Sequence, residues 1–179
     1  INEVVSEDNI PDHDYHVHIG SMMNVLQTNP NKIHQEYPYL EAEKNKEECI
    51  EPDKLNIGVI LETNRESNAH DEESVDSALM QNIFNETHNV ISLDEYLTNE
   101  KLPKNYNKHF DYTNLAQLSS LISDLDLVIT VDHLVAHLAG ALNIKTLLML
   151  PCVPNWRWEI THRHTCLLYT SDAADECLC

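Results

Sequence analysis

The chain has 179 residues, with 30 Asp and Glu against 11 Lys and Arg and a formal net charge of -19. Nucleic acids and anionic membrane surfaces are bound mainly through Lys and Arg, so this charge argues against both as partners. No apolar run approaches the roughly 18 residues of a membrane-spanning helix. The length suits about one domain with a real core.

The cysteines indicate a reducing compartment. Of the five, only Cys49 and Cys152 lie before residue 166. Two cysteines this far apart do not make the framework of a disulfide-rich domain, and a reducing cytosol suits them. We therefore expect a cytoplasmic protein.

The first 52 residues carry weak structural signals. Alternating His and apolar residues over Tyr15–Ile19 indicate a strand, and Ser21–Leu26 suits a short helix. Thr28–Leu40 is rich in Pro and Asn and predicts a connector. The charged stretch Glu41–Pro52 suits a surface helix.

From residue 55 onward, apolar runs alternate with amphipathic helical patterns. The predicted strands cover residues 55–61, 89–93, 127–131 and 146–150. Gly58, inside the first of them, permits a close approach of a neighbouring backbone. Helical patterns cover Ser74–Asn85 and Leu115–Leu125, and a further one follows residue 133. This order predicts an α/β fold with a Rossmann-like parallel sheet and flanking helices, in which the four strands are parallel neighbours.

The segment 124–158 is the most informative part of the chain. A short apolar run, Leu127–Val131, ends at Asp132, a helical pattern follows, and a second run, Leu147–Leu150, ends at Pro151. Strand, helix and strand within about 30 residues are typical of a βαβ unit. Ligands of such sheets bind beyond the carboxyl ends of the strands.

The same segment carries a family resemblance. The pattern VD-x-x-x-AHLAGAL at residues 131–142, followed by LP-x-x-P-x-WRW at 150–158, resembles a bacterial glycosyltransferase group. That group is related to the heptosyltransferases (glycosyltransferase family nine) and often follows tetratricopeptide repeats. The likeness is specific over residues 124–158 and fainter over most of residues 12–160. It implies a GT-B transferase whose C-terminal half binds a nucleotide-sugar donor, with a glycan, lipid or protein as acceptor and no cofactor.

The resemblance also divides the chain. Residues 1–40 correspond to the end of the N-terminal GT-B domain and its connector, and 41–165 to the C-terminal nucleotide-sugar-binding domain. Residues 166–179 form an unrelated tail, because CLLYTSDAADE at 166–176 resembles a translated sequencing adapter. We expect few core contacts there. The chain is then a fragment that is inactive alone, since the catalytic base of such enzymes is expected from the N-terminal half.

A nucleotide-sugar site must hold a diphosphate, and a helix start favours an anion through its free N–H groups and dipole. The turn at residues 133–136 is such a start, and Asp132 is its expected N-cap. His133 lies in this turn. His137 lies one turn further and suits a hydrogen bond to phosphate or ribose; the competing interpretation is a half-buried structural histidine.

The triplet Trp156, Arg157 and Trp158 completes the predicted donor site. Arg157 suits bidentate pairing with phosphate, and the tryptophans suit flanking a base or a sugar ring. The alternative is a rigid loop that plugs the face of the domain, because neighbours in a triplet lie on different sides of the chain.

Two small features of the helix at residues 134–141 are structural. Gly140 costs about 1 kcal/mol against Ala in a helix, so we expect close packing there rather than ligand contact. Asn143 stands where the resembling proteins usually have Gly, and it tolerates the left-handed conformation of a helix end.

Departures from the family leave other hypotheses open. His133 replaces a usual Thr, Gln117 and Leu118 replace an Asp-Thr pair, and Asp94 and Glu95 replace a Lys-containing loop. Acidic residues near a diphosphate are unfavourable, so a non-catalytic binding or scaffold domain with an eroded donor site is the second hypothesis.

A His-based metal-binding protein is the third hypothesis. It rests on His133 and His137, spaced i, i+4, and on the Asp- and His-rich stretch 12–18. Without Cys pairs or a third clear ligand, we expect no metal site.

Overall fold

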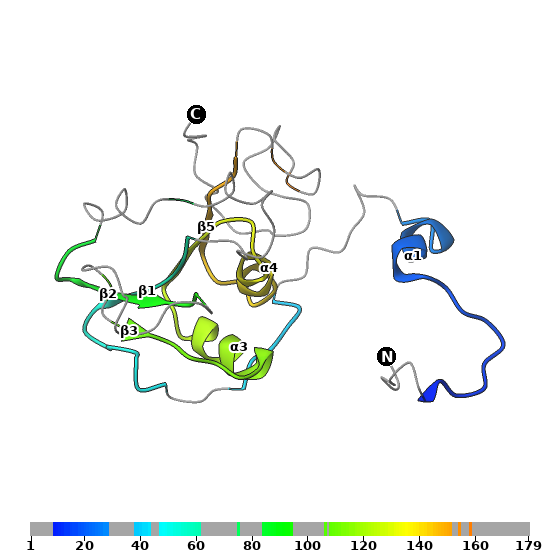
Figure 1. Ribbon diagram of the computed structural model, residues 1–179, viewed down its shortest axis with the longest axis horizontal. Helices are drawn as coiled ribbons and strands as arrows, with labels where there is room; N and C mark the ends of the chain where they lie inside the picture. The colour runs from blue at the N-terminus through cyan, green and yellow to red at the C-terminus, as the bar shows by residue number, and fades with distance from the viewer. Residues whose placement is uncertain are drawn as a thin grey trace. The chain divides into compact units, whose positions relative to one another are not determined.

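The computed structural model (Figure 1) describes residues 9–28, 38–43, 47–61, 75, 84–94, 106, 108–151, 154 and 158. The chain divides into two compact units, Ile1–His34 and Gln35–Cys179. The helix predicted over residues 74–85 lies almost wholly outside the described residues. The tail at 166–179 lies wholly outside them. No helix in the described part is long and apolar enough to cross a membrane.

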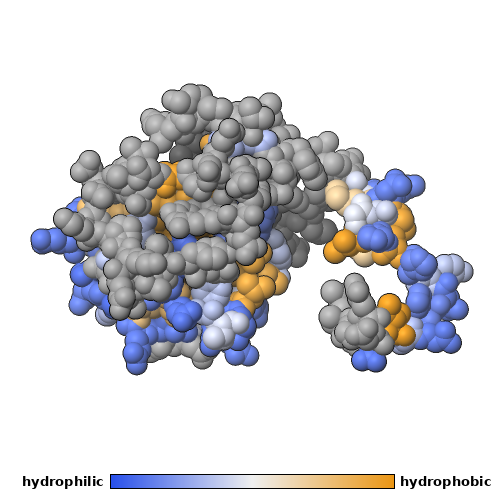
Figure 2. All heavy atoms as spheres, in the orientation of Figure 1, coloured by the Kyte–Doolittle hydropathy of each residue, from blue (hydrophilic) through white to orange (hydrophobic). Residues whose placement is uncertain are grey.

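The first unit contains α1 (Ile19–Val25), which confirms the short helix predicted near residues 21–26. The strand predicted over Tyr15–Ile19 is wrong, because residues 15–18 are irregular and Ile19 already begins the helix. A strand needs a partner and a buried face, whereas Tyr15 is 93% and Ile19 83% exposed. Apolar side chains accordingly lie on the surface of this unit (Figure 2).

The second unit is built on a five-stranded parallel sheet with the order β3-β2-β1-β4-β5. The strands are β1 (Leu55–Ile60), β2 (His88–Ser92), β3 (Lys108–His109), β4 (Leu127–Thr130) and β5 (Thr146–Leu148). All four neighbouring pairs are parallel. The predicted α/β fold and its four parallel strands are therefore confirmed, and the short edge strand β3 is an addition.

Both faces of the sheet are covered, which explains why the strands bury apolar residues on both sides and why β4 is a nearly continuous apolar run. On one face, Ile60, Ile91 and Val128 form a cluster with the buried residues of two helices, α3 (Leu115–Ser123) and α4 (Leu134–Ala141). The alternate strand residues on the other face form a second cluster, with Ile57, Val59, Val90 and Ile129 among its members.

Gly58 in the central strand β1 makes room for this packing. A Cβ placed on it would lie 2.5 Å from Leu125 Cδ1 and 2.8 Å from Leu93 Cδ1. The predicted close approach is therefore made by two buried leucine side chains rather than by a backbone.

Helix α3 begins with a reciprocal cap. The Asn114 side chain accepts a hydrogen bond from Gln117 N at 3.0 Å, while Gln117 Oε1 accepts from Thr113 N at 2.9 Å. This arrangement satisfies two backbone donors at the helix start. The helix buries Leu118, Leu121 and Ile122, whereas Leu115 in its first turn is 51% exposed.

Helix α4 ends in a Schellman motif. Asn143 has φ 60°, its N–H bonds Gly140 O at 3.0 Å, and Ile144 N–H bonds Ala139 O at 2.9 Å. The predicted role of Asn143 is confirmed. The buried face consists of small residues, including Ala139 and Gly140, which fits packing as the role of Gly140.

The surface helix predicted over residues 41–52 is wrong, because residues 41–43 and 47–52 form turns and irregular backbone. Asn56 Oδ1 accepts from Glu51 N at 2.9 Å, and Asn56 Nδ2 donates to Glu51 O at 3.0 Å. Asn89 Nδ2 donates to Cys49 O at 2.7 Å. These side chains take backbone groups that a helix would need for itself, and they fix residues 47–54 against the amino edge of the sheet.

Candidate functional site at the carboxyl edge of the sheet

The sheet has a topological switch point between β1 and β4. From β1 the chain adds β2 and then β3 on one side, and afterwards adds β4 and β5 on the other. Strands β1 and β4 are direct neighbours, paired from Ile57↔Leu127 to Ile60↔Thr130. In open parallel sheets, ligands bind at the carboxyl ends of the strands where the order reverses. Helix α4 begins at this edge, directly after β4 (Figure 1).

The helix start differs from the expectation in one residue. The N-cap of α4 is His133, not Asp132, and His133 Nδ1 accepts a hydrogen bond from Val135 N at 3.2 Å. His133 has extended backbone, φ -141° and ψ 160°, so its imidazole can reach back to the first turn as an Asn side chain does. Ala136 N–H bonds His133 O at 3.0 Å.

This cap affects anion binding. Two N–H groups of the first turn, those of Val135 and Ala136, already bond His133. To accept a hydrogen bond, Nδ1 of the imidazole must carry no proton. A diphosphate that uses the Val135 N–H therefore has to displace the His133 side chain. Asp132 lies half-buried immediately before the cap.

The structure brings His137 and Trp158 together. Their rings stack with centroids 5.0 Å apart and an interplanar angle of 20°. Trp158 is 2% exposed and packs with Ala136, Leu148 and Leu150. It thereby ties the segment after β5 to α4, which fits the interpretation of this loop as a plug on the domain face. The half-buried His137 keeps a defined ring orientation as a result.

The rest of the predicted donor site is not described. Trp156 and Arg157 lie outside the described residues, whereas Pro151 and Pro154 are half-buried. Asp132, His133 and His137 share the start of α4 through their positions in the chain. A single cleft that contains all of the predicted donor residues remains a prediction.

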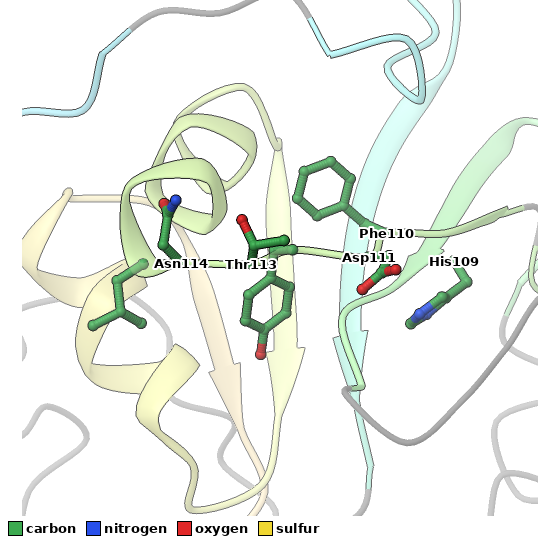
Figure 3. Close-up of a pocket in the computed structure, with 7 residues that line it drawn as sticks. His109, Phe110, Asp111, Thr113 and Asn114 are labelled. Atoms are coloured by element: carbon green, nitrogen blue, oxygen red, sulfur yellow. The ribbon is translucent and has the colours of Figure 1, made fainter.

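A pocket of about 400 Å³ lies elsewhere on the sheet, where β3 leads into α3 (Figure 3). It is lined by the seven consecutive residues His109–Leu115, none of which was predicted as a site residue. These residues follow the short edge strand β3, which the sequence did not predict. The available signals were the aromatic pair Phe110 and Tyr112 and the capping pattern at Asn114 and Gln117.

Acidic and metal-ligating side chains also bear on the site. Asp94, at the carboxyl end of β2, is 4% exposed, and its N–H bonds Ser92 Oγ at 3.3 Å. It lies one strand away from the switch point. Within the described ranges, no three His, Cys, Asp or Glu residues come together to hold a metal ion.

The chain matches no family model, no curated protein and no solved structure.

Proposed function

We propose that this chain is the donor-binding part of a nucleotide-sugar-dependent glycosyltransferase of GT-B architecture. The observation that carries the proposal is the start of α4 at the carboxyl end of β4, at the switch point of a Rossmann-like sheet. A helix start at this place favours a diphosphate through its N–H groups and dipole. The acceptor is a glycan, a lipid or a protein, and the cysteine pattern favours the cytoplasm.

Each predicted residue has a role in this proposal. His137, oriented by the Trp158 ring, donates a hydrogen bond to the diphosphate or the ribose. Arg157 pairs with a phosphate, and Trp156 flanks the base or the sugar. Asp132 positions the turn without touching phosphate, because its charge would repel it.

The chemistry required of this half is stabilisation of the leaving nucleoside diphosphate. Negative charge grows on the diphosphate as the bond to the sugar breaks, so donors fixed around it lower the barrier. The chain has only three glycines, at positions 20, 58 and 140, and therefore no glycine-rich phosphate loop. Helix α4 has to supply the backbone donors that such a loop supplies in other nucleotide-binding proteins.

Calorimetric titration of ADP, UDP and GDP into the full chain tests the proposal. His137→Phe keeps an aromatic ring against Trp158 and removes the hydrogen-bond donor. We expect this variant to weaken binding by about 1 to 3 kcal/mol, the range for losing a hydrogen bond to a charged group. His13→Phe, an exposed histidine in the first unit, is the matched control and should leave the affinity unchanged.

The second candidate function is a non-catalytic scaffold with an eroded donor site. The His133 imidazole on the Val135 N–H and the acidic Asp94 favour it, since both work against an anion. Measurable nucleotide binding that His137→Phe weakens supports the enzyme. Absence of binding for all three nucleoside diphosphates supports the scaffold.

A further inference from the structure

We propose that His133 is a pH-dependent cap on helix α4, which holds the first turn while its imidazole is neutral and releases it once the ring is protonated. His133 is the N-cap of α4, and its Nδ1 accepts a hydrogen bond from Val135 N at 3.2 Å. A ring nitrogen accepts only while it carries no proton. Protonation therefore removes this bond, whereas the backbone bond from Ala136 N to His133 O at 3.0 Å does not depend on the ring.

A comparison of the helices in the described residues shows that this arrangement is particular to α4. Helices α1, α3 and α4 each begin after a residue with extended backbone, namely His18, Asn114 and His133. The side chain of His18 makes no cap hydrogen bond, and Asn114 caps α3 through an amide oxygen that does not titrate. Of these three helices, only α4 therefore depends on a cap whose charge changes between about pH 5 and 8.

The surroundings of the first turn make the cap bond matter. Val135 is 0% exposed, so its N–H group has little access to water as an alternative acceptor. His133 is half-buried, so solvent protons reach its ring. An imidazolium at this place also meets the positive end of the helix dipole. Both the lost bond and the dipole move the protonated ring away from the first turn, which leaves the Val135 N–H open to another acceptor.

Few charged groups act on this titration. The main neighbours of α4 are β4, β5 and α3, and none of these elements contains Asp, Glu, Lys, Arg or His. Along the chain, the titratable groups beside the cap are Asp132, directly before it, and His137, one turn into the helix. Glu41 belongs to the segment 38–43, which bonds the opposite end of the helix at Ala141 O. Asp132 favours the imidazolium, while the dipole and the cap bond favour the neutral ring.

The consequence for ligand binding rests on the proposed function. An anion at the start of α4 competes with the neutral His133 ring for the Val135 N–H. Protonation removes this competitor and adds a positive charge beside the anion, so both effects strengthen binding as the pH falls. The expected gain is about fivefold or more, the factor that corresponds to one capping hydrogen bond. Binding of the donor diphosphate is then regulated by pH through His133.

Hydrogen exchange of the full chain without ligand, followed by NMR across the titration of the His133 ring, tests the cap itself. Protection of the Val135 amide, corrected for the intrinsic effect of pH, should fall about fivefold or more as His133 is protonated. The Ala136 amide, bound by the backbone oxygen of the same residue, should lose less protection. His133→Asn provides a cap that does not titrate, so the Val135 change should disappear. His18→Asn, which replaces an N-cap without a side-chain bond, is the matched control and should leave the Val135 change as it is.

Titration of sulfate, whose charge stays the same over this pH range, tests the consequence. The parent should bind sulfate about fivefold or more tightly at about pH 5.5 than at about pH 8, and His133→Asn, which keeps His137, should lose most of that difference. Val135 protection that does not fall with protonation of His133, or sulfate binding with the same pH dependence in both proteins, overturns the proposal. If nucleoside diphosphates still bind in that case, the proposed function stands without this inference. Loss of Val135 protection without binding of sulfate or any nucleoside diphosphate supports the pH-dependent cap and overturns the proposed function.

Discussion

Gly58 offers the sharpest test of how the core of the second unit is packed. The change is Gly58→Ala, which adds one methyl group in the central strand. Its Cβ would lie 2.5 Å from Leu125 Cδ1 and 2.8 Å from Leu93 Cδ1, closer than carbon atoms can approach. Leu93 is 0% and Leu125 5% exposed, so neither side chain can move into solvent to relieve the contact.

The expected loss of stability is the difference between two effects. Adding a methyl group to a well-packed core costs about 1–3 kcal/mol. Replacing glycine with alanine also reduces the conformational freedom of the unfolded chain, which stabilises the folded state by about 0.4–1 kcal/mol. A net loss of about 1 to 2 kcal/mol lowers the melting temperature by roughly 2–8 °C in a chain of this size.

Urea unfolding followed by circular dichroism measures this loss. At a slope of about 1–3 kcal/mol per molar urea, the midpoint should fall by roughly 0.3–2 M. Gly20→Ala is the control: it lies in α1 with nothing within 4 Å of an added Cβ, so it should not destabilise the chain. In a Leu125→Ala background, Gly58→Ala should cost less, because the closest contact is gone. A Gly58→Ala variant as stable as the parent would refute the steric account.

Four further outcomes follow from single residues. Asn143→Ala should lose about 1 kcal/mol in urea unfolding and Asn143→Gly should not, because φ is 60° there. His133→Ala should destabilise the chain by about 1 kcal/mol and His133→Asn much less, since Asn also caps helices. Burial raises the pKa of the Cys49 thiol above its ordinary 9.0, so iodoacetamide should alkylate Cys49 more slowly in the folded than in the unfolded chain, as read by peptide mass mapping. The hydrogen bond from Lys54 lowers the pKa of Glu51 below its ordinary 4.5. The pair therefore stabilises the fold above pH 4.5, and this stabilisation is lost as the pH falls through the lowered pKa of Glu51. The difference in unfolding free energy between Glu51→Gln and the parent should accordingly disappear on acidification.

The sheet was predictable where the sequence signal is local. Strands β1, β2, β4 and β5 each contain a short group of apolar residues that needs burial, so the local sequence indicates where they lie. Strand β3 consists of Lys108 and His109, and only the open edge of β2 makes these polar residues a strand. Such a strand forms only because it pairs with a segment distant in sequence, and no local sequence pattern encodes that pairing.

Competition between side chains and backbone explains the other errors. The composition of residues 41–52 suits a helix, but two side chains from strand starts bind the backbone of this segment: Asn56, five residues after Glu51, and Asn89, which is 40 residues from Cys49. At α4, Asp is the better N-cap by residue type, yet the helix begins one residue later and His133 takes the role. A shift of one residue is within the usual variation of helix ends, but it changes which side chain lies on the first turn.

The position of the candidate site depends partly on local sequence and partly on the assembly of the sheet. The βα unit of β4 and α4 is local, so the sequence indicated a ligand-binding helix start near residue 133. Its position at the switch point depends on β1 and β4 being neighbours, which only the assembled sheet determines. The same assembly places the acidic Asp94 at the end of β2, one strand from the switch point rather than directly at it. In a chain with a net charge of -19, this placement of Asp94 lowers the repulsion that a diphosphate at the α4 start would meet, whereas Asp132, directly before the cap, still opposes an anion there.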